Sequence, residues 1–154
     1  LMSRRFTLEN LEKLLALSRR HNDVVSIAIV DLDHFKKIND VYGHACGDAV
    51  LREFGERAMN SFRESDLIGR IGGEEFAVIL PHTTTEDADY VLNRLRIAVN
   101  IELDTVVTVS AGITNLTGDP ALNYKCADLA LYEAKAAGRD SVCLFLDTEV
   151  SEIA

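Results

Sequence analysis

Cysteine is scarce in this chain, with three residues among 154, and it follows no metal-binding pattern. Cys46, Cys126 and Cys143 are odd in number and lack a Cys-x-x-Cys spacing. The sequence therefore indicates neither a disulfide framework nor a zinc site. We expect the three thiols to be small, mostly buried side chains.

The chain also lacks an excess of basic residues. Its 16 Lys and Arg stand against 25 Asp and Glu, for a formal net charge of -9. Because nucleic-acid backbones require a basic face, a general nucleic-acid partner is not expected. Positive charge that serves an anionic ligand has to be local.

Long apolar runs, repeats and low-complexity linkers are absent as well. No stretch approaches the roughly 20 apolar residues of a membrane-spanning helix, and no signal-peptide pattern opens the sequence. We therefore expect a cytoplasmic segment without membrane contact. At 154 residues and 47% hydrophobic, the chain is long enough for one core and too short for two, which predicts a single domain.

The apolar pattern predicts alternating helices and strands. In chain order it first indicates a helix around Leu8, Leu11, Leu14, Leu15 and Leu17, a strand at 24–30, a short helix at 36–42 and a longer helix after Gly43. A hairpin follows at 66–71 and 76–80, closed by Pro81, and then a helix capped by Thr84 or Thr85 that runs to about 100. The last elements are a strand at 105–113, a helix from about 122 to 137 ending at Gly138, and a strand at 141–145. This order predicts an α/β (α+β) fold, with helices packed on a mixed sheet that has a central antiparallel hairpin.

Acids and glycines interrupt the predicted hairpin at its tip. Gly72, Gly73, Glu74 and Glu75 stand between two apolar runs. Glycine accepts a positive φ and, without a Cβ, lets a ligand approach the backbone closely. The tip is therefore predicted to hold a ligand; solvated turn acids are the alternative for this segment alone.

A second acidic position follows a buried strand. The apolar run at 24–30 ends at Asp31, and Lys36 and Lys37 follow shortly after. Two acids at the ends of neighbouring strands suit Mg²⁺, which takes hard oxygen ligands and leaves room for waters and substrate phosphates. A helix-capping or turn aspartate is the alternative for Asp31.

Ordered motifs over residues 1–145 together resemble the GGDEF family of diguanylate cyclases. They are Asp31, Leu32, Asp33, His34, Phe35 and Lys36; Asn39 and Asp40; Gly43 and His44; Gly47 and Asp48; Gly72, Gly73, Glu74, Glu75 and Phe76; Ala127 and Asp128; Leu131 and Tyr132; Ala134 and Lys135; Gly138 and Arg139. The family condenses two GTP into cyclic di-GMP and two pyrophosphates. The resemblance implies a ferredoxin-like palm, as in nucleotide cyclases, in a domain at 1–146, followed by a tail at 147–154 that we expect to be disordered.

The resemblance also implies a metal centre. Asp31, Glu74 and the backbone carbonyl of Leu32 would hold two Mg²⁺ ions per GTP, with Mn²⁺ as a substitute, and Glu75 is a further carboxylate needed at the tip. The ions would lower the pKa of a ribose 3′-hydroxyl that attacks the α-phosphate of another GTP. A role of Glu75 as a base stays open.

Substrate contacts follow from the same resemblance. Asn39 and Asp48 match guanine-binding positions, and a carboxylate can accept from guanine N1–H and N2–H, which adenine does not offer. Lys36, Lys135 and Arg139 match triphosphate contacts, and the tip glycines complete the substrate-binding set (Gly72, Gly73). Ordinary turn chemistry, and cations placed at a helix C-terminus, are the alternatives.

A regulatory site is implied as well. Arg63 and Asp66 match the Arg-x-x-Asp site at which the family binds its own product, and Arg94 falls where a second product-binding arginine occurs. Feedback inhibition by cyclic di-GMP is therefore expected. An exposed ion pair between positions i and i+3 is the alternative for Arg63 and Asp66.

The start of the chain departs from the family pattern. The usual Asp-x-Leu-Thr-Gly-Leu-x-Asn-Arg-Arg opening is reduced to Leu1, Met2, Ser3, Arg4 and Arg5. We expect an upstream sensory or dimerising domain, and a homodimer for catalysis because each site holds one GTP. A non-catalytic module that senses cyclic di-GMP or GTP is the alternative function. A plain dimerisation domain ranks last, because it leaves the acids unexplained.

Overall fold

The computed structural model describes residues 5, 9, 12, 13, 16, 24–99, 101–116 and 119–145. The leucines of the predicted first helix and the predicted tail at 147–154 lie outside the described residues. Among the described residues, no helix combines the length and the apolar character that crossing a membrane would need.

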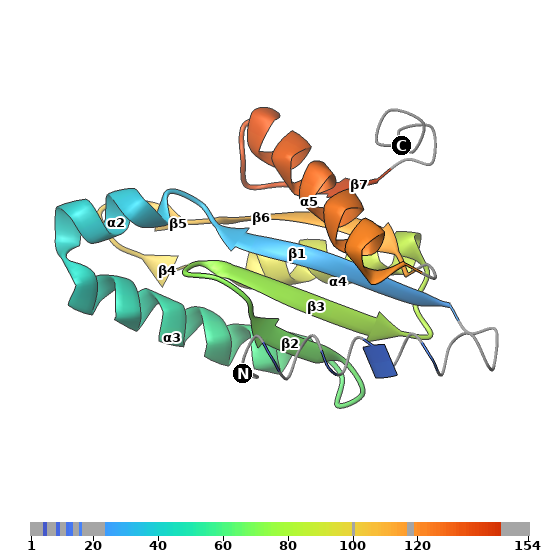
Figure 1. The fold of residues 1–154 in the computed structure, drawn as a ribbon. Helices are drawn as coiled ribbons and strands as arrows, with labels where there is room; N and C mark the ends of the chain where they lie inside the picture. The colour runs from blue at the N-terminus through green and yellow to red at the C-terminus, as the bar shows by residue number, and fades with distance from the viewer. Residues whose placement is uncertain are drawn as a thin grey trace.

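A five-stranded mixed sheet lies at the centre of the molecule (Figure 1), in the order β2-β3-β1-β6-β7. Its strands are β1 (Val25–Leu32), β2 (Leu67–Arg70), β3 (Glu75–Pro81), β6 (Val109–Asn115) and β7 (Val142–Leu144). The central strand β1 is antiparallel to both β3 and β6, whereas β7 runs parallel to β6. The predicted mixed sheet with its antiparallel hairpin is confirmed.

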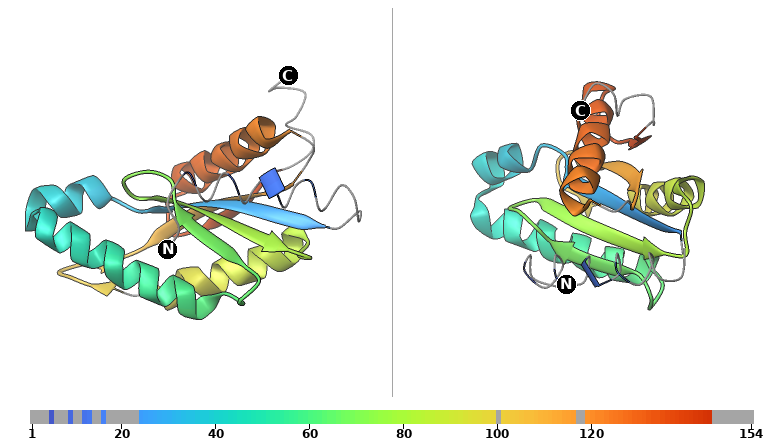
Figure 2. Two further views of the ribbon diagram at one scale, coloured as in Figure 1. Left: turned by 60° about the horizontal axis from the view of Figure 1, so that its bottom comes forward. Right: turned by 45° about the vertical axis from the view of Figure 1, so that its right-hand side comes forward.

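Helices cover both faces of this sheet. They are α2 (Phe35–Tyr42), α3 (His44–Ser61), α4 (Thr85–Ala98) and α5 (Pro120–Ala136). Figure 2 shows α5 on one face, with α3 and α4 on the other. Because β1 is covered on both sides, all of its residues are buried, as the largely apolar run at 24–30 predicts.

Successive side chains of β1 alternate between the two faces of the sheet and therefore pack against different helices. Ala28 and Val30 belong to the main core, together with Phe54 of α3 and Leu92 of α4. Ile29 packs instead with Ala127 and Leu131 of α5. Since side chains alternate between the faces of a strand, Asp31 falls on the α5 face with Ile29.

Helix α5 lies directly on β6 because one position lacks a side chain. A Cβ added at Gly112 would stand 2.2 Å from the carbonyl oxygen of Ala127 and 2.2 Å from the backbone nitrogen of Leu131. Real side chains do not approach backbone so closely, so only glycine permits this packing. Gly112 thereby sets the height of α5 above the sheet.

Several local boundaries differ from the predictions. The predicted strand at 105–113 is divided into β5 (Val106–Val107) and β6, and β5 pairs with an unpredicted β4 (Ile101–Glu102). Strands of two residues are too short to give a periodic signal. Helix α4 ends at Ala98 rather than near 100. Of the two threonines predicted as its cap, Thr84 is the one that accepts from the backbone N–H of Asp87.

The predicted burial of the cysteines is confirmed in part. Cys126 is buried, whereas Cys46 and Cys143 are half-buried. Cys46 packs against the main core from α3.

Candidate active site

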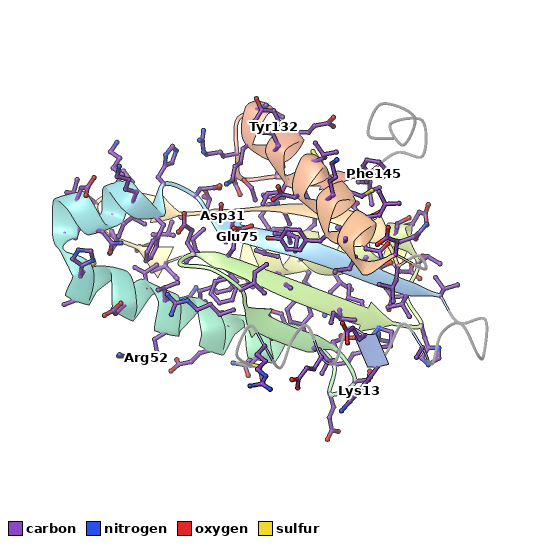
Figure 3. All side chains as sticks on the ribbon, in the orientation of Figure 1. Lys13, Asp31, Arg52, Glu75, Tyr132 and Phe145 are labelled. Carbon is purple, nitrogen blue, oxygen red and sulfur yellow. The ribbon has the colours of Figure 1, made fainter. Side chains whose placement is uncertain are left out.

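Carboxylates of two neighbouring strands meet at one end of the sheet. Asp31 of β1 pairs in register with Glu75 of β3, and the backbone N–H of Leu32 donates to the carbonyl oxygen of Glu74 at 3.3 Å. Figure 3 shows the labelled Asp31 and Glu75 together where β1 ends and β3 begins. The antiparallel register therefore brings the three residues predicted to bind metal, Asp31, Leu32 and Glu74, to one place.

Asp31 is buried and only partly satisfied. It is 5% exposed, and its Oδ2 atom accepts a charged hydrogen bond from Lys135 Nζ of α5. Its Oδ1 atom is buried without a hydrogen-bond partner among the described residues. An unmet buried acceptor of this kind costs about 1–3 kcal/mol, and such groups concentrate at functional sites.

The two paired carboxyls hold their protons unusually tightly. Burial raises the pKa of Asp31; Lys135 lowers it in part, and the charges of Glu74 and Asp33 raise it further. Burial likewise raises the pKa of Glu75, with further contributions from Asp31 and Asp128. The site carries more negative charge than its own cation neutralises.

A divalent cation fits these residues. The unmet Oδ1 of Asp31, the neighbouring backbone of Leu32 and the carboxylate of Glu74 are all hard oxygen ligands, and added positive charge would relieve their repulsion. Within the described ranges, no three His, Cys, Asp or Glu side chains form a metal-binding group. Mg²⁺ takes one or two protein carboxylates and keeps its other coordination positions for water or phosphate, which suits a pair of acids.

The glycines of the hairpin tip do not adopt the predicted backbone geometry. Among the described glycines, positive φ occurs at Gly43 and Gly138, not at Gly72 or Gly73. The strands are joined by the longer loop 71–74, so the tight turn that requires positive φ does not form. A Cβ added at Gly73 would meet no atom within 4 Å, which means that neither strain nor packing explains this glycine. Its bare backbone leaves the surface open to a ligand.

Arg70 holds the tip in shape and had no role in the sequence analysis. Its guanidinium donates to the carbonyl oxygen of Gly72 at 3.0 Å and to that of Gly73 at 3.1 and 2.7 Å. The N–H groups of Ile71 and Gly72 donate to the carbonyl oxygen of Glu75 from the other side of the loop. An arginine two residues before a pair of glycines was the available signal.

The two residues predicted to bind guanine lie on packed helices. Asn39 belongs to α2 and Asp48 to α3, and the two helices pack together. A Cβ added at Gly47 would stand 1.8 Å from Asn39 Oδ1 and 3.3 Å from Phe35 Cζ. Gly47 therefore provides the space in which the Asn39 side chain lies, one residue before the exposed Asp48.

The predicted triphosphate cations differ in their surroundings. Lys135 lies against Asp31, so α5 brings it to the acids. Lys36 is exposed in the first turn of α2, and Arg139 is exposed in the loop after α5. With respect to other described residues, neither of these two side chains makes a hydrogen bond or ion pair.

The residues of the predicted regulatory site gather around the segment between α3 and β2. The Arg63 guanidinium donates to Asp66 at 2.9 Å and also to the Pro81 carbonyl oxygen and to Thr83. Arg94 of α4 donates to the carbonyl oxygen of Ser61 at 2.7 Å. The Arg63 side chain is 57% exposed but that of Asp66 only 2%, so one partner of the ion pair is buried, unlike in the exposed pair considered as the alternative.

A small cavity lies between α2 and β5. Its volume is about 160 Å³, and it is lined by residues of α2 and β5, among them Lys37 and Tyr42. None of the residues predicted to bind substrate lines it.

Comparisons with known proteins identify the family of this chain. The family model described as "Diguanylate cyclase, GGDEF domain" matches residues 1–141. The response regulator PleD of Caulobacter vibrioides is 40% identical over 153 residues, which cover 92% of this chain and 34% of PleD. The chain thus spans about a third of the length of that relative.

Solved structures are similar over nearly the whole chain. The active GGEEF domain of a diguanylate cyclase from Vibrio cholerae has a TM-score of 0.89 and 31% identity, covering 96% of this chain and 99% of that one. The GGDEF domain of DgcB from Caulobacter crescentus, in complex with c-di-GMP, has a TM-score of 0.87 and 27% identity, covering 92% and 90%. The chain belongs to the GGDEF family of diguanylate cyclase domains.

Proposed function

We propose that two copies of this domain condense two GTP into cyclic di-GMP and release two pyrophosphates. The observation that carries the proposal is the buried, unpartnered Oδ1 of Asp31 beside Leu32 and Glu74. A binding module has no need of an uncompensated acidic pair, whereas phosphoryl transfer requires a metal there. The named activity of the GGEEF domain from Vibrio cholerae supports the same reading.

Asp31, Glu74 and the carbonyl of Leu32 would hold two Mg²⁺ ions, or Mn²⁺ in their place. When bound, the ions supply Lewis-acid chemistry, lowering the pKa of the 3′-hydroxyl and neutralising charge on the α-phosphate. Lys135, which lies against Asp31, would bind a phosphate oxygen next to the acids that would hold the ions. The bare backbone of Gly73 admits the phosphates at the tip.

Guanine would be recognised between α2 and α3. The exposed carboxylate of Asp48 can accept from N1–H and N2–H of guanine together, and Asn39 adds a donor and an acceptor. Adenine would leave the Asp48 carboxylate unpaired, which disfavours ATP. Lys36 and Arg139 would contact the triphosphate of the same nucleotide.

The test of this function is cyclic di-GMP formation from GTP and Mg²⁺, measured by chromatography over a range of protein concentrations. Because each domain would hold one GTP, product should rise more than in proportion to protein concentration. An absence of product even when two chains are held together by a fused dimerising module would instead favour the sensor function.

Replacing Gly47 with alanine is expected to raise the KM for GTP about tenfold, equivalent to about 1.4 kcal/mol. The added methyl would stand 1.8 Å from Asn39 Oδ1, so the Asn39 side chain must leave its place beside Asp48. Steady-state kinetics with GTP measure the effect, with the exposed Ala45→Ser on the same helix as the control. An unchanged KM would rule out this role of Asn39.

As the pH is lowered, binding of substrate with Mg²⁺ is expected to weaken at a higher pH than it would if the site carboxyls had ordinary pKa values. Because the pKa values of Asp31 and Glu75 are raised, both groups gain protons earlier as the pH falls, and protonated carboxyls do not bind the ion. By linkage, their contribution to folding is present at low pH and is lost as the pH rises through the raised pKa values.

The charge of Asp128 offers a way to measure this shift. Asp128→Asn removes one of the charges that raise the pKa of Glu75, so the acid limb of the activity profile should move to lower pH. Lys125→Gln, an exposed change on the same helix, is the control. Identical acid limbs for wild type and Asp128→Asn would contradict the assignment.

We further propose that Arg63, Asp66 and Arg94 bind cyclic di-GMP and slow the enzyme. The planar guanidinium of Arg63 suits phosphate and purine faces, and its 57% exposed side chain leaves it accessible. Arg63→Ala is expected to keep turnover linear while product accumulates, whereas the wild type slows. The exposed Arg52→Ala on α3 is the control. Product binding unchanged by Arg63→Ala in calorimetry would refute this site.

A further inference from the structure

The loop after α5 has an unusual backbone at the residue expected to contact the triphosphate. Gly138, Arg139 and Asp140 follow one another with φ values of 115°, 64° and 45°. Residues other than glycine seldom adopt this left-handed region and keep it only when their surroundings hold them there. What holds Asp140 and Arg139 therefore decides where the Arg139 guanidinium lies.

Helix α5 itself accounts for only the first part of the loop. The N–H of Gly138 donates to the carbonyl oxygen of Lys135 at 3.3 Å, and that of Arg139 donates to Ala134 at 3.1 Å. These bonds close the end of the helix. The N–H of Asp140 is the first to leave the helix.

The acceptor of that N–H is the buried carboxylate of Asp33. The distance from the Asp140 nitrogen to Asp33 Oδ2 is 3.0 Å, and Asp33 is 4% exposed. The same carboxylate accepts from the hydroxyls of Thr108 and Ser110, each at 2.7 Å. Asp33 is thus anchored to the sheet while it holds the loop.

The Arg139 side chain has no competing internal contact. Its guanidinium makes no hydrogen bond or ion pair to another described residue, and the residue is exposed. The Asp140 carboxylate accepts from Arg96 of α4 at 3.1 Å. Asp140 is therefore held at both its N–H and its carboxylate, while the Arg139 guanidinium stays free for an external anion, and this fixed backbone lowers the entropic cost of binding one.

We propose that Asp33 is a positioning residue: through the Asp140 N–H it fixes the loop that presents Arg139 to the triphosphate of the bound nucleotide. This inference rests on the proposed binding of GTP. It gives Asp33 a role separate from that of Asp31. Asp31, two residues earlier in the chain, contacts Lys135 instead. The two contacts join the end of β1 to the end of α5 at two points.

The test compares binding of 3′-deoxy-GTP, which lacks the attacking hydroxyl, with binding of GMP, both with Mg²⁺ and by calorimetry. Asp33→Ala removes the acceptor for the Asp140 N–H, so it should weaken binding of 3′-deoxy-GTP about tenfold more than binding of GMP. Asp33→Asn should restore the wild-type ratio of the two dissociation constants, because its amide oxygen can accept from Thr108 and Asp140 while its NH₂ donates to Ser110. Equal weakening of both nucleotides by Asp33→Ala would overturn the proposal.

A double-mutant cycle with Arg139→Ala tests the route of the effect. If Asp33 acts through Arg139, then Asp33→Ala should not weaken 3′-deoxy-GTP further in the Arg139→Ala background; additive losses would refute it. Thr108→Val, which removes a donor to Asp33 but leaves the Asp140 contact, should retain the wild-type ratio.

Folding and the underlying function are checked separately. Thermal unfolding verifies each variant, and Asp33→Ser, whose hydroxyl is too short to reach Asp140, replaces Asp33→Ala if the latter does not fold. A wild-type domain that binds neither nucleotide would refute the proposed function. If the wild type binds 3′-deoxy-GTP and the Asp33 variants leave the ratio of the dissociation constants for 3′-deoxy-GTP and GMP unchanged, only the role of Asp33 is refuted.

Discussion

Replacing Glu74 with alanine is expected to lower cyclic di-GMP formation about a thousandfold, which corresponds to about 4 kcal/mol of transition-state stabilisation. The change removes one of the two carboxylates proposed to bind the ions and would leave Asp31 to hold them with the Leu32 carbonyl. Because metal charge stabilises the transferring phosphoryl group more than the ground state, kcat should fall more than the affinity for GTP.

The domain should remain folded when Glu74 is changed. The contact that joins the tip to β1 is made by the Glu74 backbone carbonyl, which accepts from the Leu32 N–H, and alanine retains it. Product formation and thermal unfolding should be measured beside Glu56→Ala, an exposed glutamate of α3. Activity within about tenfold of wild type would show that Glu74 is not a metal ligand.

Replacing Gly112 with alanine is expected to destabilise the fold by about 3 kcal/mol, the upper part of the usual range for overpacking. The new Cβ would stand 2.2 Å from two backbone atoms of α5, and helix backbone cannot turn aside as a flexible side chain can. The whole helix would have to rise from β6. Lys135 would then move away from Asp31, so residual activity should fall as well.

Gly73→Ala is the matched control for stability. Its Cβ would meet no atom within 4 Å, so the free energy of unfolding should change by less than about 0.5 kcal/mol. Denaturant unfolding of both variants measures the contrast. Equal unfolding midpoints for Gly112→Ala and the wild type would mean that α5 does not rest on β6 as described.

The elements and the acidic positions followed from the sequence alone. The apolar run at 24–30 predicts a buried strand, Thr84 is a typical helix cap, and Pro81 is the last residue of β3, as expected. These signals are local, because strand burial, capping and chain reversal depend on a few consecutive residues. The motif resemblance then predicted which acids and cations share one site.

Tertiary structure decided how those residues are held. The Lys135 contact to Asp31 spans 104 residues and the Asp140 contact to Asp33 spans 107, so no local pattern indicates either. The break between β5 and β6 falls at Thr108, whose carbonyl oxygen accepts from the Asp33 N–H and whose hydroxyl donates to the Asp33 carboxylate. The sequence does not distinguish the roles of Gly112 and Gly47. The structure shows that Gly112 lets the backbone of α5 pack closely on β6, whereas Gly47 leaves space for the Asn39 side chain. Such differences arise from sheet register and helix packing, which are set by contacts among segments far apart in the chain.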